Sequence, residues 1–252
     1  MRKAGKILVA VTAAVLLSTV VGHAKRSEIL RSRLTYPKPV AEISVPTTSD
    51  RVALVIANSR YPDADAPLRR IAGDARAFAG ALRDRGYRVD VVANGRHADM
   101  TRAVARLKTQ MRPGGTVILY LGGFAVQSRG QNYLIPTDAA IWTERDVRRQ
   151  GLDIDRLLGE LKNSGAKVQL AYVDASWRNP YERRFRAYSH GLAPFAADAS
   201  TEIVTAAAPD HVVDDVGQPH SALMTALVDR LNSSEQVEQA FRDVRSMKQA
   251  ML

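Results

Sequence analysis

The segment YVDASWRNPY, at residues 172–181, carries a serine in a place suited to nucleophilic chemistry. The apolar run that leads into this segment predicts a buried strand that ends at Val173. In open α/β sheets, ligands and nucleophiles lie just beyond the carboxyl ends of the strands. Ser176 is therefore the first candidate residue, either as a nucleophile or as a small residue in the place of one.

A serine hydroxyl attacks a carbonyl group only after a base has taken its proton, so the candidate bases matter. Three histidines follow the last two predicted strands, on the same broad rim: His190, His211 and His220. One of them could form a dyad with Ser176, with Asp210 or Asp214 as the orienting acid. The alternative is that these are loop histidines without a catalytic role, and that Ser176 is a small, hydrogen-bonded residue in a vestigial pocket.

The composition limits the other chemistry. The chain has 252 residues, of which 46% are hydrophobic and 25% charged, and this is typical of a globular protein with one domain. It contains no cysteine, which excludes a thiol nucleophile, a disulfide and a cysteine-ligated zinc or iron–sulfur site. The glycine pairs Gly114-Gly115 and Gly122-Gly123 lack the spacing of a phosphate-binding or dinucleotide-binding loop. We therefore predict no cofactor and no metal.

Residues 1–24 have the three parts of a secretory signal peptide. Basic residues precede an apolar stretch over residues 7–21, and the segment Gly22-His23-Ala24 supplies small residues for a cleavage site. The apolar stretch is shorter than the ~20 residues that a spanning helix needs, so we expect cleavage after Ala24 rather than a retained anchor. The mature protein is then expected to be periplasmic or secreted, without a stable membrane span.

Residues 25–50 are rich in Pro, Ser and Thr and predict a linker or extended arm, and residues 51–252 are expected to form one domain. The formal charge of +10 falls to +7 once the three basic residues of the signal are removed. The arginines are spread over polar helix faces, apart from a cluster at Arg183, Arg184 and Arg186. We expect a solvated surface and no nucleic-acid binding.

From residue 51 onward, apolar runs of strand length alternate with segments of helical periodicity. Strands are predicted at residues 51–58, 87–92, 116–121, 167–173 and 202–208. Helices are predicted around residues 68–82, 100–111, 154–161, 222–231 and 236–248. The run AVQSRGQNYLI predicts a hairpin that turns at Ser128-Arg129-Gly130. Strands joined by helices of this length indicate right-handed crossovers and a parallel, doubly wound sheet.

Several sequence stretches occur in an order that, taken together, indicates a protein family. They are RVALVIANSRY, GDARAFAGALRDRGYRV, ILYLGGFAVQSRGQNYLIPTDAAI, LDIDRLLGEL, VQLAYVDASWRNPY, GLAP and SALMTAL. This order, from about Arg51 to Arg230, resembles the caspase-like peptidases, in particular their bacterial metacaspase-type branch. The resemblance implies an α/β fold, a caspase-like three-layer sandwich with a mostly parallel central sheet flanked by helices.

The chemistry of that family depends on a histidine in a His-Gly pair after the third strand and a cysteine in an Asp-x-Cys motif after the fourth. The cysteine attacks the peptide carbonyl, the histidine handles protons, and backbone amides hold the oxyanion. The resemblance places Phe124 at the histidine position and Ser176 at the cysteine position. Both members of the dyad are then replaced, and we expect no intact catalytic site. We expect Phe124 to be buried near Ser176, in the space of the missing imidazole.

The resemblance also implies a role for Asp174, because the aspartate of Asp-x-Cys lines the pocket for a basic side chain in metacaspase-type enzymes. Its presence is compatible with a cleft that still recognises Arg or Lys without cutting. The alternative is that Asp174 caps backbone amides where the strand turns. Trp177 and Tyr181 are expected to line a groove for an extended peptide or, alternatively, to anchor their own loop.

The leading hypothesis is therefore an exported caspase-fold pseudopeptidase that binds a peptide or protein partner, a basic one if Asp174 lines the pocket. One alternative is a residual or repurposed serine hydrolase that uses Ser176. Another is a structural, envelope-associated domain whose cleft is silent. A histidine nitrogen within hydrogen-bond reach of the Ser176 hydroxyl would favour the hydrolase.

Overall fold

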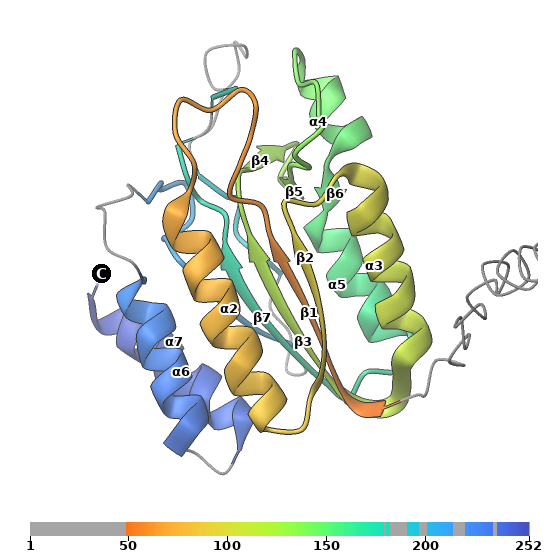
Figure 1. Cartoon of the computed structure of the whole chain (residues 1–252), viewed down its shortest axis with the longest axis vertical. Coiled ribbons are helices and arrows are strands. Elements are labelled where there is room, and N and C mark those ends of the chain that lie inside the picture. Colours follow the sequence, from red (N-terminus) through yellow and green to blue (C-terminus); the bar gives the residue numbers. More distant parts are fainter. Residues whose placement is uncertain are drawn as a thin grey trace, which may run out of the picture. The chain divides into compact units, whose positions relative to one another are not determined.

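Five parallel strands form the central sheet (Figure 1). In spatial order they are β2 (Arg88–Ala93), β1 (Ser49–Ala57), β3 (Met111–Gly122), β7 (Val168–Asp174) and β8 (Thr201–Thr205). This computed structural model describes residues 49–178, 180–181, 191–196, 201–213, 220–233 and 236–251. Because all five strands are parallel, their carboxyl ends share one edge of the sheet, and this edge is where the candidate residues follow β3 and β7.

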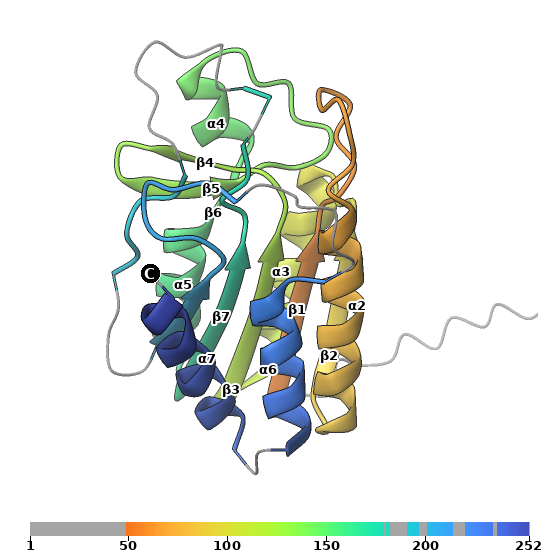
Figure 2. The same ribbon diagram turned by 90° about the vertical axis from the view of Figure 1, so that its left-hand side faces the viewer.

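Helices cover both faces of this sheet, so the domain has three layers (Figures 1 and 2). One face packs against α2 (Arg69–Asp84), α6 (Ala222–Ser233) and α7 (Val237–Met251). The other packs against α3 (His97–Gln110) and α5 (Ile154–Asn163). The middle strands are buried on both faces, which explains their continuous apolar sequences. The predicted three-layer α/β sandwich with a parallel sheet is confirmed.

A second, three-stranded sheet follows β3. It consists of β4 (Ala125–Ser128), β5 (Gln131–Leu134) and β6 (Leu152–Asp153), and the pairings are antiparallel. Arg129 and Gly130 form the turn between the first two strands, with φ angles of 54° and 76°. The predicted hairpin is thus confirmed at the predicted turn.

The sequence-based prediction missed two elements and misplaced the ends of two others. Helix α4 (Glu144–Gln150) and strand β6 were not predicted. The second predicted helix ends at Gln110, and Met111 belongs to β3 instead. Strand β8 ends at Thr205, so the alanines after it belong to a loop. Within the described ranges, no helix has the length and apolarity needed to cross a membrane.

Candidate functional site

The backbone segments that follow β3 and β7 run side by side beyond the sheet. Gly122 and Asp174 are paired in the last register position of the two strands. The Gly123 amide then donates to the Asp174 carbonyl at 3.1 Å, and the Ala125 amide donates to the Ala175 carbonyl at 3.1 Å. The two positions that the sequence singled out, Phe124 and Ser176, therefore follow adjacent strands at the same edge.

Phe124 is turned into the core by the glycine before it. Gly123 has a φ of 144°, and a Cβ atom there would lie 2.4 Å from the Tyr61 hydroxyl, so only glycine fits. The Phe124 ring packs on the Tyr61 ring with centroids 4.6 Å apart, and its amide donates to the Tyr61 hydroxyl at 3.0 Å. Phe124 is 3% exposed, so the predicted burial of this ring is confirmed.

Ser176 is buried, with 1% of its surface exposed. Its carbonyl accepts a hydrogen bond of 2.6 Å from the Val213 amide. Its Oγ atom has no hydrogen-bond partner among the described residues. A buried hydroxyl without a partner costs about 1–3 kcal/mol, so this arrangement does not serve the stability of the fold.

Ser176 is among the residues that line a cavity of about 190 Å³ at the carboxyl ends of β7 and β8. Apart from Ser176, the walls are formed by residues 192–195, by Ile203 and Thr205 of β8, by residues 207–209 of the following loop and by Arg245 of α7. Most of these side chains are apolar. Neither Phe124 nor Asp174 is among the residues that line this cavity.

Hydrogen bonds hold the two loops of the cavity wall together. The Asp210 amide donates to the Leu192 carbonyl at 3.0 Å, and the buried Asn132 side chain bonds both the amide and the carbonyl of Ala193. Gly191 has a φ of 72°, and a Cβ atom at this position would lie 2.2 Å from the His211 carbonyl oxygen. The close approach of the two loops therefore requires glycine here.

Two cationic side chains of α7 lie at this end of β8. Arg245 lines the cavity and forms an ion pair of 2.8 Å with Glu202. Lys248 donates to the Thr205 hydroxyl at 2.5 Å and to the Ala207 carbonyl at 2.7 Å. Burial lowers the pKa of the Lys248 ammonium group. Both residues thus fix the β8 end of the cavity.

The described histidines of the rim bond to groups other than Ser176. The His211 Nδ1 atom lies 2.8 Å from the Pro209 carbonyl oxygen, and the His220 Nδ1 atom lies 2.9 Å from Asp74 Oδ1. The proposed orienting acid Asp210 accepts a hydrogen bond from Gln127 instead. His190 and Asp214 lie outside the described residues. None of the described histidines supplies a base to Ser176.

The contact between Asp74 and His220 belongs to a cluster on the α2 face of the sheet. The Asp74 carboxylate is fully buried and also accepts the Ser221 amide at 3.2 Å. Burial raises the pKa of Asp74, and the hydrogen bonds from His220 and Ser221 oppose this shift. The Ser221 hydroxyl accepts the Met224 amide at 2.9 Å and lies 3.3 Å from the Tyr172 hydroxyl. Asp74 therefore anchors the start of α6 to α2.

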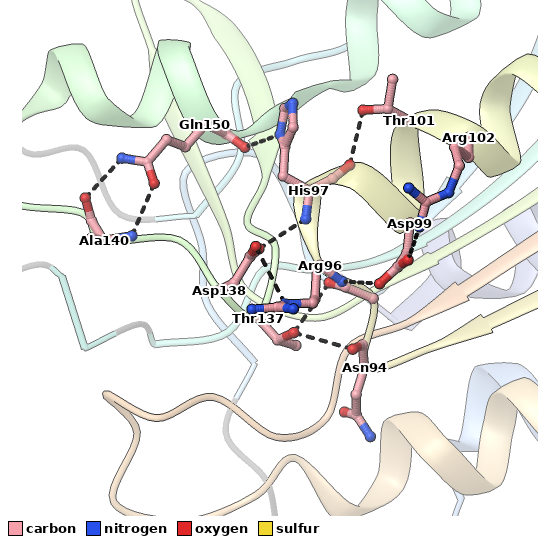
Figure 3. Close-up of polar contacts among 11 residues, drawn as sticks. Asn94, Arg96, His97, Asp99, Thr101, Arg102, Thr137, Asp138, Ala140 and Gln150 are labelled. Carbon is pink, nitrogen blue, oxygen red and sulfur yellow. Dashed lines mark hydrogen bonds and ion pairs between the residues drawn. The ribbon is translucent and has the colours of Figure 1, made fainter.

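His97 has a structural position at the start of α3 (Figure 3). Its amide donates to Asp138 at 2.8 Å, and its Nδ1 atom lies 2.8 Å from the Gln150 carbonyl oxygen. Figure 3 shows that the same group of contacts includes the Thr137 hydroxyl, which donates to the Asn94 carbonyl. These bonds connect the loop after β2 and the start of α3 with the segment between β5 and α4 and with the end of α4.

The three residues predicted to bind a peptide are buried in this structure. Asp174 is 0% exposed, Trp177 is 3% exposed and Tyr181 is 1% exposed. The Trp177 indole donates to the Asp174 carbonyl at 3.0 Å, and the Arg70 guanidinium lies over its ring at 4.6 Å. A peptide would reach these side chains only after the surrounding loops had moved. Their role in binding stays a prediction.

Two stacked tyrosines lie near the Asp174 carboxylate. The rings of Tyr120 and Tyr172 are 5.9 Å apart and nearly parallel. Burial raises the pKa of both phenols, and the negative charge of Asp174 raises it further. The environment of Asp174 is therefore aromatic and buried, and both predicted roles of its carboxylate stay open.

Sequence reasoning missed most of the cavity wall. Thr205 and Arg245 of the wall, and Asn132, which holds Ala193 in place, were not singled out, because each is an ordinary polar residue of a strand or helix. One signal was present. The run GLAP, at residues 191–194, was among the stretches that carried the family resemblance, and it forms part of the wall.

These elements define a class of protein: a three-layer α/β sandwich with a parallel sheet, in which the candidate site lies beyond the carboxyl ends of β3 and β7. A sequence model of the caspase domain matches residues 50–249. The chain therefore belongs to the caspase-domain family. A comparison with curated proteins finds no match.

Proposed function

We propose that this protein is an exported pseudopeptidase of metacaspase type, which binds a peptide or protein partner at the Ser176 site and does not cleave it. Membership of the caspase-domain family supports a peptide-binding ancestry. The sequence contains no cysteine, so the thiol chemistry described above is excluded.

The single observation that carries the proposal is the state of the Ser176 hydroxyl. Ser176 is buried and is among the residues that line the cavity, and no described residue forms a hydrogen bond with its hydroxyl. A serine nucleophile requires a base within about 2.6–3.2 Å, and the described histidines bond elsewhere. A group that is costly to bury and has no base is better suited to binding than to attack.

The substitution of the dyad positions gives the proposal its chemical basis. Phe124, at the position that the family resemblance assigns to histidine, packs on Tyr61 and cannot carry a proton. The Ala125 amide next to it donates to the Ala175 carbonyl, so this donor is already used. Both features oppose a reaction that needs a proton carrier and an oxyanion site.

The rival function is a serine hydrolase, and one observation favours it. His220 and Asp74 make the Nδ1–carboxylate contact that orients the imidazole in serine hydrolases. We expect the purified protein to release no product from a tripeptide reporter with Arg at the cleavage site. Turnover that disappears in Ser176→Ala and in His220→Gln would establish the hydrolase and refute the pseudopeptidase.

A gain-of-function series tests whether the dyad positions are assigned correctly. Ser176→Cys alone should remain inactive, because no base raises the fraction of thiolate. Phe124→His combined with Ser176→Cys is the minimum for cleavage, and Ala125→Gly is added so that the imidazole can turn. If Asp174 lines a basic pocket, the cleavage follows Arg or Lys and is lost in Asp174→Ala. Cleavage after acidic residues would refute that pocket.

Export is a separate part of the proposal, because residues 1–48 lie outside the described structure. We expect the mature protein to begin at Lys25 and to be found in the periplasm or the medium. Mass spectrometry of the exported protein should show the loss of residues 1–24. A cytoplasmic protein that retains Met1 would refute export and leave the site unaffected.

The third function, a structural envelope-associated domain, predicts that the cavity binds nothing. A peptide-binding screen distinguishes it from the pseudopeptidase, because only the latter requires affinity at the Ser176 site.

A further inference from the structure

The Ser176 cavity differs in charge from a pocket for a basic side chain. Of the described residues that line it, Arg245 alone is charged, and its charge is positive. The Arg245 guanidinium is held in its ion pair with Glu202, and the side chain is 45% exposed at the rim. A lysine or arginine that entered the cavity would find no carboxylate among the described lining residues, and the nearby Glu202 carboxylate is already paired with Arg245.

The size and the walls of the cavity favour a single apolar side chain. Leu192, Phe195 and Ile203 supply large apolar surfaces, and the cavity volume is about 190 Å³. An apolar cavity of roughly 150 Å³ is enough for a benzene-sized group. The Ser176 cavity therefore has room for one aliphatic or aromatic side chain.

Ser176 and Thr205 are the two hydroxyl-bearing residues among those that line the cavity, and their hydroxyls differ in how they are bonded. The Thr205 hydroxyl donates to the Ala207 carbonyl and accepts from Lys248. The Ser176 hydroxyl is 1% exposed and has no hydrogen-bond partner among the described residues. A hydroxyl can both donate and accept, so the main-chain amide or carbonyl of a peptide would satisfy the Ser176 hydroxyl once a shift of the cavity wall had exposed it.

We infer that this cavity binds an uncharged, apolar side chain of an extended peptide, with the Ser176 hydroxyl bonded to the peptide main chain. The inference rests on the proposed function, peptide binding at the Ser176 site, and it names the class of side chain that is bound. It separates this cavity from the buried Asp174, which is not among its lining residues.

The first experiment measures side-chain preference. Short blocked fluorescent peptides, identical except for Leu, Phe, Ala, Arg or Glu at one guest position, are titrated with the purified full-length protein, and affinity is read from fluorescence anisotropy. We expect the Leu or Phe peptide to bind about tenfold more tightly than the Ala peptide, and the Arg peptide to bind no better than Ala.

Matched variants locate the preference in the cavity. Ala207→Leu fills the cavity and should remove the advantage of Leu and Phe. The neighbouring Ala206→Leu should keep this advantage, since Ala206 is also partly buried and is not among the lining residues. If Ala207→Leu does not fold, Ile203→Ala serves instead and should shift the preference from Leu toward Phe. Ser176→Ala should weaken every peptide alike, by about threefold to tenfold.

The outcomes separate this inference from the function on which it rests. Tightest binding of the Arg peptide, lost in Asp174→Asn, overturns the apolar specificity and retains peptide binding. A Leu and Phe advantage that persists in Ala207→Leu overturns the assignment to this cavity, and so does an unchanged ratio of Leu to Phe affinity in Ile203→Ala if Ala207→Leu does not fold. A protein that binds none of the peptides overturns the proposed peptide-binding function itself.

Discussion

Two buried serines, Ser221 and Ser176, differ in how their hydroxyls are used. Ser221 is 8% exposed, and its Oγ atom accepts the Met224 amide and contacts the Tyr172 hydroxyl. Ser176 is 1% exposed, and its Oγ atom has no hydrogen-bond partner among the described residues. The first hydroxyl contributes to the fold, whereas the second is the kind of unsatisfied group that marks a functional site.

The surroundings of the two serines differ in the same way. Around Ser221, the polar groups of Asp74 and His220 are joined by hydrogen bonds on the face of the sheet that α2, α6 and α7 cover. Around Ser176, loops with mostly apolar side chains form the walls of a cavity. The contacts of Ser221 on the face covered by α2, α6 and α7 stabilise the domain, whereas the proposal places binding at the loops around Ser176. The following predictions test this division.

The largest effect is expected at Phe124. Phe124→Ala removes a ring that is 3% exposed and packed on Tyr61, so it should lower the free energy of unfolding by about 3–5 kcal/mol. Phe195→Ala is the control, because Phe195 is only partly buried and lines the cavity. It should cost much less. Urea denaturation of both variants measures the difference, and equal losses would contradict the division.

A smaller effect is expected at Asp74. Asp74→Ala leaves the buried Ser221 amide without its acceptor and should lower the free energy of unfolding by about 2 kcal/mol. Asp74→Asn keeps one acceptor oxygen and should cost less. A loss in Asp74→Asn as large as in Asp74→Ala would mean that the charge, not the hydrogen bonds, holds the start of α6.

The same carboxylate gives a pH dependence with a defined sign. Burial raises the pKa of Asp74 above its ordinary value of 3.8, so the native state binds this proton more tightly than the unfolded state. The stability contributed by this proton is complete below pH 3.8 and is lost as the pH rises through the native pKa. The stability of the wild type relative to Asp74→Asn should therefore be greater at acidic than at neutral pH. Thermal unfolding measures this difference, and repeating it in proteins that also carry His220→Gln removes the contribution of the imidazole. A stability difference that is the same at acidic and neutral pH would contradict the raised pKa of Asp74.

Much of the fold could be predicted because its signals are local. The central strands are continuous apolar runs, and the turn of the hairpin at Arg129-Gly130 has its own signature. Helix α4 was missed because its sequence, ERDVRRQ, has no apolar stripe, and Val147 is its one buried residue. Its start, Thr143 with Asp146 three residues later, resembles a capping box, with Asp in place of the usual Glu or Gln.

The candidate site could be predicted only in part. The strand end at Asp174 and the position of Ser176 follow from the apolar run before them. The contact between Asp74 and His220 joins residues 146 positions apart, and no local pattern indicates it. The cavity wall is equally non-local, since Asn132 fixes Ala193 across 61 positions. Such contacts depend on the packing of loops, which periodicity does not encode.

The smallest effects provide the sharpest test, because the two serines should respond with opposite signs. Ser221→Ala removes the acceptor of the Met224 amide at the start of α6 and should lower the free energy of unfolding by about 1 kcal/mol. Ser176→Ala removes a buried hydroxyl that has no described partner, so the cost of burying it disappears. This variant should be more stable than the wild type by up to about 1 kcal/mol.

Chemical denaturation measures both changes, with a constant m-value as the control for an unaltered unfolded state. Destabilisation of Ser176→Ala to the same extent as Ser221→Ala would show that the Ser176 hydroxyl is part of the structural network, and the argument that sets this cavity apart for binding would fail. If the Ser176→Ala variant is more stable than the wild type and also binds peptides more weakly, the Ser176 hydroxyl lowers the stability of the fold and contributes to binding.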